Sequence, residues 1–158
     1  MPNIILTRID NRLVHGQVAT QWNGTIGANL ILVANDKVSV DELQQGLMDM
    51  AAPTGVAMRY FSIQKTIDVI GNASEDQKIF IIVHDPQDAL KLVEGGVPIK
   101  KLNVGNMHMA EGKKQVATSV AVDAADQEAF RKLQEAGVEL FIQRVPQIAA
   151  EDVNKLFS

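Results

Sequence analysis

The sequence predicts one α/β domain over residues 1–158, a mostly parallel sheet of about seven strands with helices on both faces. Short aliphatic runs alternate with helix-compatible segments along the whole chain. Aromatic residues make up only 4% of the sequence, so the core must be built from Val, Ile, Leu and Ala. The connections are short, and short strand-to-helix connections imply parallel strands.

Composition excludes several classes of protein. The net charge of −4 argues against a nucleic-acid binder, which needs a basic surface. There is no cysteine, hence no disulfide, thiolate metal site or cysteine nucleophile, which fits the cytosol. The start of the chain lacks the features of a signal peptide, and no apolar run approaches the roughly 20 residues of a membrane span. We therefore expect no direct membrane insertion, and 158 residues suggest a stand-alone polypeptide.

The first element is a strand over Asn3–Ile9, apolar at nearly every position, as in a sheet covered on both faces. Asp10–Val14 follows as a polar loop. The first helix begins at His15 or Gly16 and ends at about Ile26, where glycines stop it.

A second buried strand is expected over Asn29–Ala34. Ser39 then resembles an N-cap, with Glu42 three residues on as the other half of a capping box. The helix that they start runs to about Met50. Its spacing predicts one apolar face, made of Val40, Leu43, Leu47 and Met50.

The same signals place the remaining elements. Further strands are expected at Val56–Phe61, Lys78–Val83, Ile99–Val104, Lys114–Val122 and Val138–Val145. Further helices are expected at Ile63–Ile70, Gln87–Glu94, Ala124–Ala136 and, as a short terminal helix, Glu151–Phe157. The expected N-caps of the first three are Ser62, Asp85 and either Asp123 or Asp126.

Polar and glycine residues follow the expected strands at their carboxyl ends. Ligands of such sheets bind outside these ends, at the point where the strand order reverses. The segments that meet there are Ile9–His15, Asn35-Asp36, Phe61-Ser62, His84-Asp85 and Gly105–Met109.

The loop after the first strand has the chemistry of a phosphoryl-accepting site. Arg8 and Arg12 supply forked donors that match phosphate oxygens. Gly16 allows close approach of backbone at a helix start, which favours an anion. His15 offers a lone pair for in-line attack. Asp10 either bonds the far ring nitrogen of His15 or pairs with Arg12, and spacing does not decide between these roles.

Other candidates have competing interpretations. Ser62 could reach a phosphoryl group, although a helix cap is the simpler interpretation. His84, beside Asp85, is a structural or interface histidine or else a second acceptor. His108, between two methionines, suits either an adaptable contact surface or ordinary loop packing. The three histidines are scattered and no glycine-rich nucleotide motif is present, so we expect neither metal nor cofactor.

The stretch R-I-D-N-R-L-V-H-G-Q-V-A-T-Q-W resembles the opening of the IIB components of the mannose–fructose–sorbose family of the bacterial sugar phosphotransferase system. The resemblance covers essentially the whole chain and is nearest to the N-acetylgalactosamine/galactosamine branch. Further segments of this kind are Leu92–Val97, Asn103–Met107, Glu111–Lys113, Ser119–Val122 and Ala129–Leu133.

The resemblance implies a function. His15 would take a phosphoryl group at Nδ1 from the phosphohistidine of a IIA protein, with Asp10 and Arg12 as acidic and basic partners. The group would pass to a sugar moved by the membrane components IIC and IID, which recruit the cytoplasmic chain to the membrane. Two departures from the family pattern are Asn11, where many members carry aspartate, and Asn106, where glycine or proline is common.

Two other functions are compatible with an α/β fold of this size. A non-catalytic α/β module could bind a phosphorylated ligand with the same arginines and helix end, and would tolerate replacement of His15. A flavodoxin-like electron carrier would need aromatic side chains to stack a flavin, which the expected strand ends lack.

Overall fold

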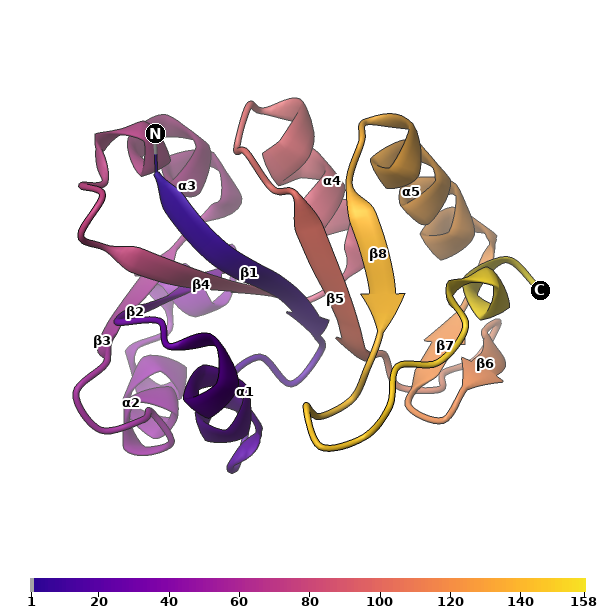
Figure 1. Ribbon diagram of the computed structural model, residues 1–158, viewed down its shortest axis with the longest axis horizontal. Coiled ribbons are helices and arrows are strands. Elements are labelled where there is room, and N and C mark those ends of the chain that lie inside the picture. Colours follow the sequence, from indigo (N-terminus) through magenta and orange to yellow (C-terminus); the bar gives the residue numbers. More distant parts are fainter. Residues whose placement is uncertain (1) are drawn as a thin grey trace.

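The computed structural model describes residues 2–158 and has the predicted alternation of strands and helices (Figure 1). The strands are β1 (Asn3–Asp10), β2 (Leu30–Ala34), β3 (Ala57–Phe61), β4 (Lys78–Val83), β5 (Lys101–Asn106), β6 (Lys114–Ala117), β7 (Val120–Val122) and β8 (Glu139–Ile142). The α-helices are α1 (Val18–Ile26), α2 (Glu42–Met50), α3 (Ile63–Val69), α4 (Pro86–Glu94) and α5 (Ala124–Glu135). Short 3₁₀ helices are η1 (Val38–Val40), η2 (Ile70–Asn72) and η3 (Val153–Phe157).

Six strands form one parallel sheet in the order β3-β2-β4-β1-β5-β8, so β1 lies inside the sheet with β4 and β5 as its neighbours. The connections from β1 to β2 and β3 run toward the β3 edge of the sheet, whereas those from β4 to β5 and β8 run toward the β8 edge. The winding therefore reverses beside β1, and the carboxyl end of β1 lies where ligands of such sheets bind.

The expected strand over Lys114–Val122 is wrong in one respect. It is a hairpin, with β6 antiparallel to β7 in a separate two-stranded sheet that lies beside the C-terminal η3 in Figure 1. The alternating pattern does not distinguish one strand from the two halves of a hairpin, and the expected exposed face is absent from β7, where all three residues are buried. A bridge from Met107 to Val120 attaches the hairpin to the end of β5.

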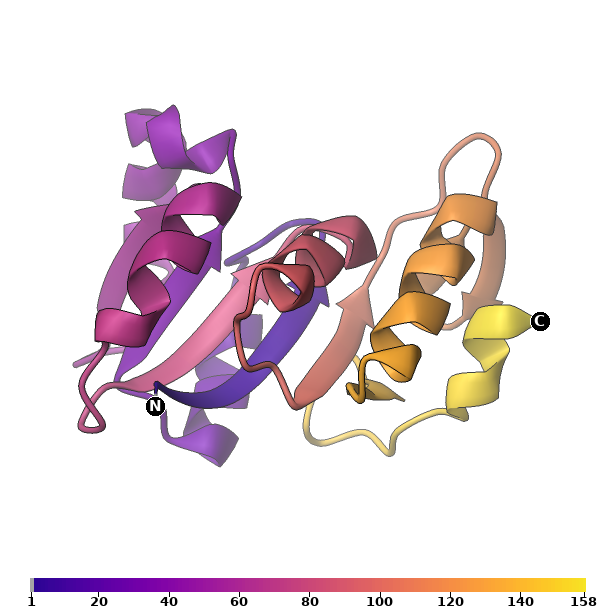
Figure 2. The ribbon, with the colours of Figure 1, turned by 90° about the horizontal axis from the view of Figure 1, so that it is seen from above.

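The helices cover both faces of the sheet, as expected. Trp22 of α1 and Met48 of α2 belong to the apolar cluster on one face, together with Phe80 of β4. Leu92 of α4 and Phe130 of α5 belong to the cluster on the other face. Figure 2 shows α4 and α5 side by side over this second face.

Three predicted helix caps are confirmed. The Ser62 hydroxyl accepts the Lys65 N–H at 3.0 Å, and the Asp85 carboxylate accepts the Asp88 N–H at 2.8 Å. Asp123, and not Asp126, caps α5, and Asp126 completes the capping box.

The predicted cap of α2 is wrong. Ser39 lies inside η1, where its hydroxyl donates to the Asp36 carbonyl at 2.6 Å. Asp41 caps the helix instead and accepts the Gln44 N–H at 3.1 Å. A single 3₁₀ turn before the helix moves the start by two residues, which the capping pattern does not reveal.

The apolar face predicted for α2 is present at Leu43, Leu47 and Met50, but it points to solvent. The prediction is wrong for Val40, because it lies in η1, before the extended cap residue Asp41. All four side chains are exposed: Val40 by 85%, Leu43 by 73%, Leu47 by 53% and Met50 by 84%. Only Met48 of this helix is buried.

Candidate active site

The loop after β1 presents His15 to solvent from a firmly anchored backbone. Leu13 and Val14 are 6% and 5% exposed and pack into the cluster beneath α1. The Leu13 N–H donates to the Asp10 carbonyl at 2.8 Å. Leu13 has a φ of 61°, the left-handed conformation that is rare for a non-glycine residue. Such strain persists where surrounding contacts over-determine the backbone, as they do here.

The first helix starts later than expected, at Val18, so His15 lies in the loop and not on the helix. The His15 carbonyl accepts the Val18 N–H at 3.2 Å, which ties the loop to α1. Gly16, at a φ of 51°, makes the turn between them. Gln17 provides no side-chain cap, so the first turn of α1 is open to an anion from the side of the loop.

Asp10 orients Arg12, which decides between its two predicted roles. Its Oδ1 accepts the Arg12 backbone N–H at 3.0 Å and Nε at 3.1 Å, and its Oδ2 accepts Arg12 Nη2 at 3.2 Å. Asp10 is fully buried, whereas the Arg12 side chain keeps 26% of its surface exposed. The carboxylate thus fixes an arginine that reaches the surface.

Arg8 is placed differently from the expectation that it binds phosphate. Only 1% of it is exposed, and its guanidinium donates to Asn103 Oδ1 at 2.6 Å and Asp10 Oδ2 at 3.1 Å. It also lies 5.6 Å from the centre of the Trp22 ring. Burial lowers the pKa of Arg8, partly offset by the Asp10 carboxylate. Arg8 therefore supports the site from beneath and does not face a ligand.

Gly105 on β5 is required by this buried arginine. A Cβ atom at Gly105 would lie 2.1 Å from the Arg8 guanidinium carbon. The glycine of the family-like segment Asn103–Met107 thus makes room for a side chain of β1.

Ser62 also departs from its expected phosphate-binding role. It caps α3 at the end of β3, which is three strands from β1 in the sheet order. At about 4.8 Å per strand this is a separation of roughly 14 Å. The helix-cap interpretation is the one that the geometry supports.

Arg12 lines a cleft of about 320 Å³ together with a second arginine, Arg144. The full lining is Arg12, Asn106, Met107, His108, Met109, Gln115, Thr118, Ser119 and Arg144. Trp22 Nε1 donates to the Arg144 carbonyl at 3.2 Å, which holds the loop after β8 against α1. Sequence reasoning missed Arg144, because no local motif marks it and only the β5–β8 pairing brings its loop to this edge.

A second cleft, of about 380 Å³, adjoins the same loop and contains Asn11, His84 and His108 among its lining residues. Asn11 Oδ1 accepts Asn106 Nδ2 at 2.8 Å, and the Asn11 N–H donates to the Asn106 carbonyl at 3.1 Å. The two departures from the family pattern are therefore direct partners. His84 Nδ1 lies 3.0 Å from Asp85 Oδ2, and this hydrogen bond raises the pKa of His84.

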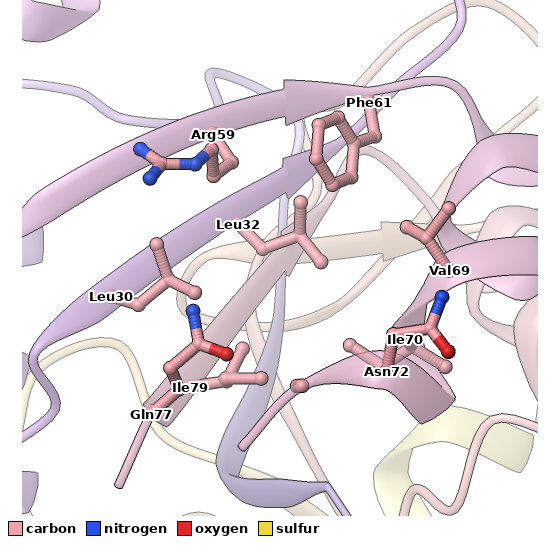
Figure 3. A pocket seen from close by; sticks show the side chains of 10 residues that line it. Leu30, Leu32, Arg59, Phe61, Val69, Ile70, Asn72, Gln77 and Ile79 are labelled. Atoms are coloured by element: carbon pink, nitrogen blue, oxygen red, sulfur yellow. The ribbon is translucent and has the colours of Figure 1, made fainter.

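Figure 3 shows a groove of a different kind, away from His15. It measures about 180 Å³ and lies between β2, β3 and η2. Its lining is mainly apolar, from Leu30, Leu32, Phe61, Val69, Ile70 and Ile79, with Arg59, Asn72 and Gln77 at the edge. It shares no residue with the two clefts beside the loop.

Residues 2–158 contain no group of three or more His, Cys, Asp or Glu side chains arranged to hold a metal ion. None of their helices has the length and apolar character that crossing a bilayer requires.

Comparisons with known proteins place this geometry in a family. A family model described as "PTS system sorbose subfamily IIB component" matches residues 4–158. N-acetylgalactosamine-specific phosphotransferase enzyme IIB component 2 of Escherichia coli (strain K12) is 54% identical over 156 residues, 99% of each chain. The mannose-specific EIIAB component of the same organism is 40% identical over 141 residues, which span 89% of this chain and 44% of that relative.

Solved structures agree with the sequence comparisons. The N-acetylgalactosamine-specific IIB component 1 from Escherichia coli superimposes with a TM-score of 0.92 at 53% identity, covering 96% of this chain and 99% of that one. The IIB domain of the sorbose permease from Klebsiella pneumoniae superimposes with a TM-score of 0.91 at 37% identity, covering 98% of this chain and 95% of that one. The chain therefore belongs to the sorbose-subfamily IIB components of the sugar phosphotransferase system, which are phosphotransferases.

Proposed function

We propose that His15 carries a phosphoryl group between two partners of a sugar phosphotransferase system. Nδ1 of His15 attacks the phosphorus of a phosphohistidine on a IIA protein, and the new P–N bond forms as the IIA P–N bond breaks. A sugar hydroxyl then attacks the same phosphorus, the bond to His15 breaks with its electron pair returning to Nδ1, and the hydroxyl proton passes to solvent. The sugar is bound by the membrane components IIC and IID, so the chain works in the cytoplasm at the inner face of the membrane.

The observation that carries the proposal is that the exposed His15 shares its loop with Arg12, an arginine fixed by a buried carboxylate. The loose transition state of phosphoryl transfer puts charge on three equatorial oxygens, which preorganised donors stabilise. Arg12 is preorganised because Asp10 accepts three of its N–H groups. As further donors to these oxygens we propose Arg144, which lines the same cleft as Arg12, and the N–H groups at Gly16 and the start of α1.

Arg8 and Ser62 have no direct part in this proposal. Arg8 contributes by holding Asp10, and its own guanidinium is used inside the protein. Ser62 contributes to the start of α3.

The test is the intact mass of the chain after incubation with phosphoenolpyruvate, the general phosphotransfer proteins and IIA. We expect a gain of one phosphoryl group that is acid-labile and base-stable. His15→Ala should gain none, whereas His84→Gln and His108→Gln, the matched controls at the other two histidines, should gain it normally. Labelling of His15→Ala would refute the proposal, and an unchanged mass of the wild type would favour a non-catalytic module that binds a phosphorylated ligand.

An amino sugar is the substrate class that we propose. Two relatives, 54% and 56% identical, are named as N-acetylgalactosamine-specific, against 40% or less for the sorbose and mannose proteins compared. Growth on a panel of sugars after deletion of the gene tests this. Loss of growth on sorbose or mannose alone would contradict it.

A further inference from the structure

A stripe of apolar side chains on the outer surface of α2 has no partner within the described chain. Residues 2–158 expose seven large apolar side chains, and four of them, Val40, Leu43, Leu47 and Met50, follow one another at intervals of three and four residues. At 100° per residue, Leu43, Leu47 and Met50 share one face of α2, and Val40 lies in η1 just before the helix. We call these four residues the α2 stripe. Contiguous exposed apolar surface of this kind marks interaction sites in stable proteins.

The outward orientation of the stripe is fixed from the opposite side of the helix. Met48 is 6% exposed and packs into the core. Gln45 Nε2 donates to the Val38 carbonyl at 2.7 Å. The Tyr60 hydroxyl on β3 bonds the Gln45 carbonyl at 3.2 Å and Asp49 Oδ1 at 2.5 Å. These contacts all lie on the side of α2 opposite the stripe. Rotating the stripe into the core would therefore break all of them.

The stripe begins at the same edge of the sheet as His15. Val40 ends η1, which follows the carboxyl end of β2, and Asn35 Oδ1 holds this turn by accepting the Val38 N–H at 3.0 Å. In the sheet order only β4 lies between β2 and β1. Two strand spacings are about 10 Å. One partner can therefore contact the His15 loop and the stripe together.

The charges beside the stripe select its occupant. From Lys37, the N-cap of η1, to Met50 the charged residues are one lysine, Lys37, and three acids, Asp41, Glu42 and Asp49, so the acidic residues predominate. A second copy would bring acidic groups against acidic groups, and an anionic lipid surface would be repelled as well. A partner with lysine or arginine beside apolar side chains is complementary.

The size of the stripe points to one part of a larger, transient interface. The helix has nine residues, a length of about 14 Å. A stable complex buries about 800 Å² on each partner, more than a helix face of this length supplies. Docking to the stripe must therefore act together with contacts elsewhere, and the His15 edge is the neighbouring surface.

We propose that the α2 stripe docks a basic, apolar segment on the cytoplasmic side of the membrane component that binds the accepting sugar. Cytoplasmic loops of membrane proteins carry an excess of lysine and arginine, which is the chemistry that the flanks of the stripe require. The inference rests on the proposed function, because it names where the phosphorylated chain meets its acceptor.

The test compares two half-reactions of a Leu43→Gln/Leu47→Gln double variant. In one half-reaction the sugar bound to IIC and IID in inverted membrane vesicles serves as the acceptor. In the other, purified phosphorylated IIA serves as the donor. We expect the KM for the phosphorylated chain to rise at least tenfold with the vesicles, with kcat unchanged. Uptake of phosphate from IIA should stay within twofold of the wild type. Phe157→Gln, an exposed apolar residue of η3 far from α2 in Figure 1, is the matched control and should change neither step.

Three results would overturn the inference. An unchanged KM with the vesicles is the first. The second is a loss confined to uptake from IIA, which would assign the stripe to that protein. The third is a wild-type dimer in sedimentation velocity that the double variant abolishes, which would assign it to a second copy. Thermal unfolding shows whether the double variant is folded. We expect its Tm to change by less than about 2 °C, because the substituted side chains are exposed.

A charge reversal beside the stripe tests the same inference, and a charge reversal elsewhere on the surface is its control. Glu42→Lys, at the start of α2, should weaken vesicle binding, whereas Glu75→Lys, at an exposed position before β4, should not. Co-sedimentation of the unphosphorylated chain with vesicles that contain or lack IIC and IID measures this binding. If the wild type takes up no phosphate, the proposed function fails, while co-sedimentation still decides whether the stripe docks.

Discussion

Helices α1 and α2 have nine residues each and lie on the same face of the sheet, yet they cover different surfaces. Helix α1 buries Trp22, whose ring covers the Arg8 guanidinium and whose Nε1 holds the Arg144 carbonyl. Helix α2 buries Met48 and leaves Leu43, Leu47 and Met50 in solvent. The comparison teaches that periodicity reveals an apolar face, while the sheet beneath and the polar anchors decide which face is covered.

The largest expected difference between the helices is in stability. Trp22→Ala should lower the free energy of unfolding by about 3–5 kcal/mol, because it leaves a cavity over a buried guanidinium. Leu47→Ala, at a comparable position of α2, should change it by less than about 0.5 kcal/mol. Urea unfolding measures both. Equal effects of the two substitutions would show that the stripe is packed in solution.

The next largest loss of stability is expected at the buried ion pair that α1 covers. Asp10→Asn removes the carboxylate that pairs with the buried Arg8, and breaking such a pair costs about 3 kcal/mol. Arg12 loses its anchor as well, so the rate of phosphoryl uptake should fall. Urea unfolding and the labelling rate of the refolded protein measure the two effects. Glu128→Gln, which removes an exposed partner of Arg131, should leave stability unchanged, and a similar loss there would contradict the argument.

A smaller effect is expected where α2 is held. Tyr60→Phe removes the hydroxyl bonded to Gln45 and Asp49, a loss of about 1 kcal/mol. Burial, and then the Asp49 carboxylate, raise the pKa of Tyr60.

Because the folded-state pKa of this acid lies above its unfolded value, the stabilisation is complete below about pH 10 and is lost as the pH rises through the folded value. Between pH 9 and 11 the wild type should therefore lose more stability than Tyr60→Phe. Thermal unfolding across this range checks the sign, and parallel losses would contradict it.

The smallest effects are expected at the partners Asn11 and Asn106. Asn11→Ala leaves Asn106 Nδ2 without its acceptor and should cost about 1 kcal/mol. Asn11→Asp keeps an acceptor and should cost less than about 0.5 kcal/mol. A double-mutant cycle with Asn106→Ala should give a coupling free energy of at least about 0.5 kcal/mol, measured by urea unfolding. Additive effects would mean that the hydrogen bond contributes nothing.

Local patterns predicted much of the fold because their physics is short-range. The caps at Ser62 and Asp85 were found because a side chain bonds a backbone N–H three residues on. The cap at Ser39 failed because η1 intervenes before α2, and only contacts with Asn35 and Asp36 favour that turn. The hairpin β6–β7 was predicted as one strand because alternation does not distinguish a strand from two halves of a hairpin.

The sequence by itself determined the order of strands and helices, the edge on which polar residues collect, and His15 as the residue to test. Only the tertiary structure decided that Asp10 holds Arg12, that Arg8 is buried, that Arg144 joins the cleft, and that the α2 stripe faces outward. The physical reason is the distance along the chain over which each interaction acts. Capping and periodicity act within a few residues, whereas these four outcomes depend on strand neighbours and side chains distant in the chain, such as Asn103 beside Arg8 and Tyr60 beneath α2.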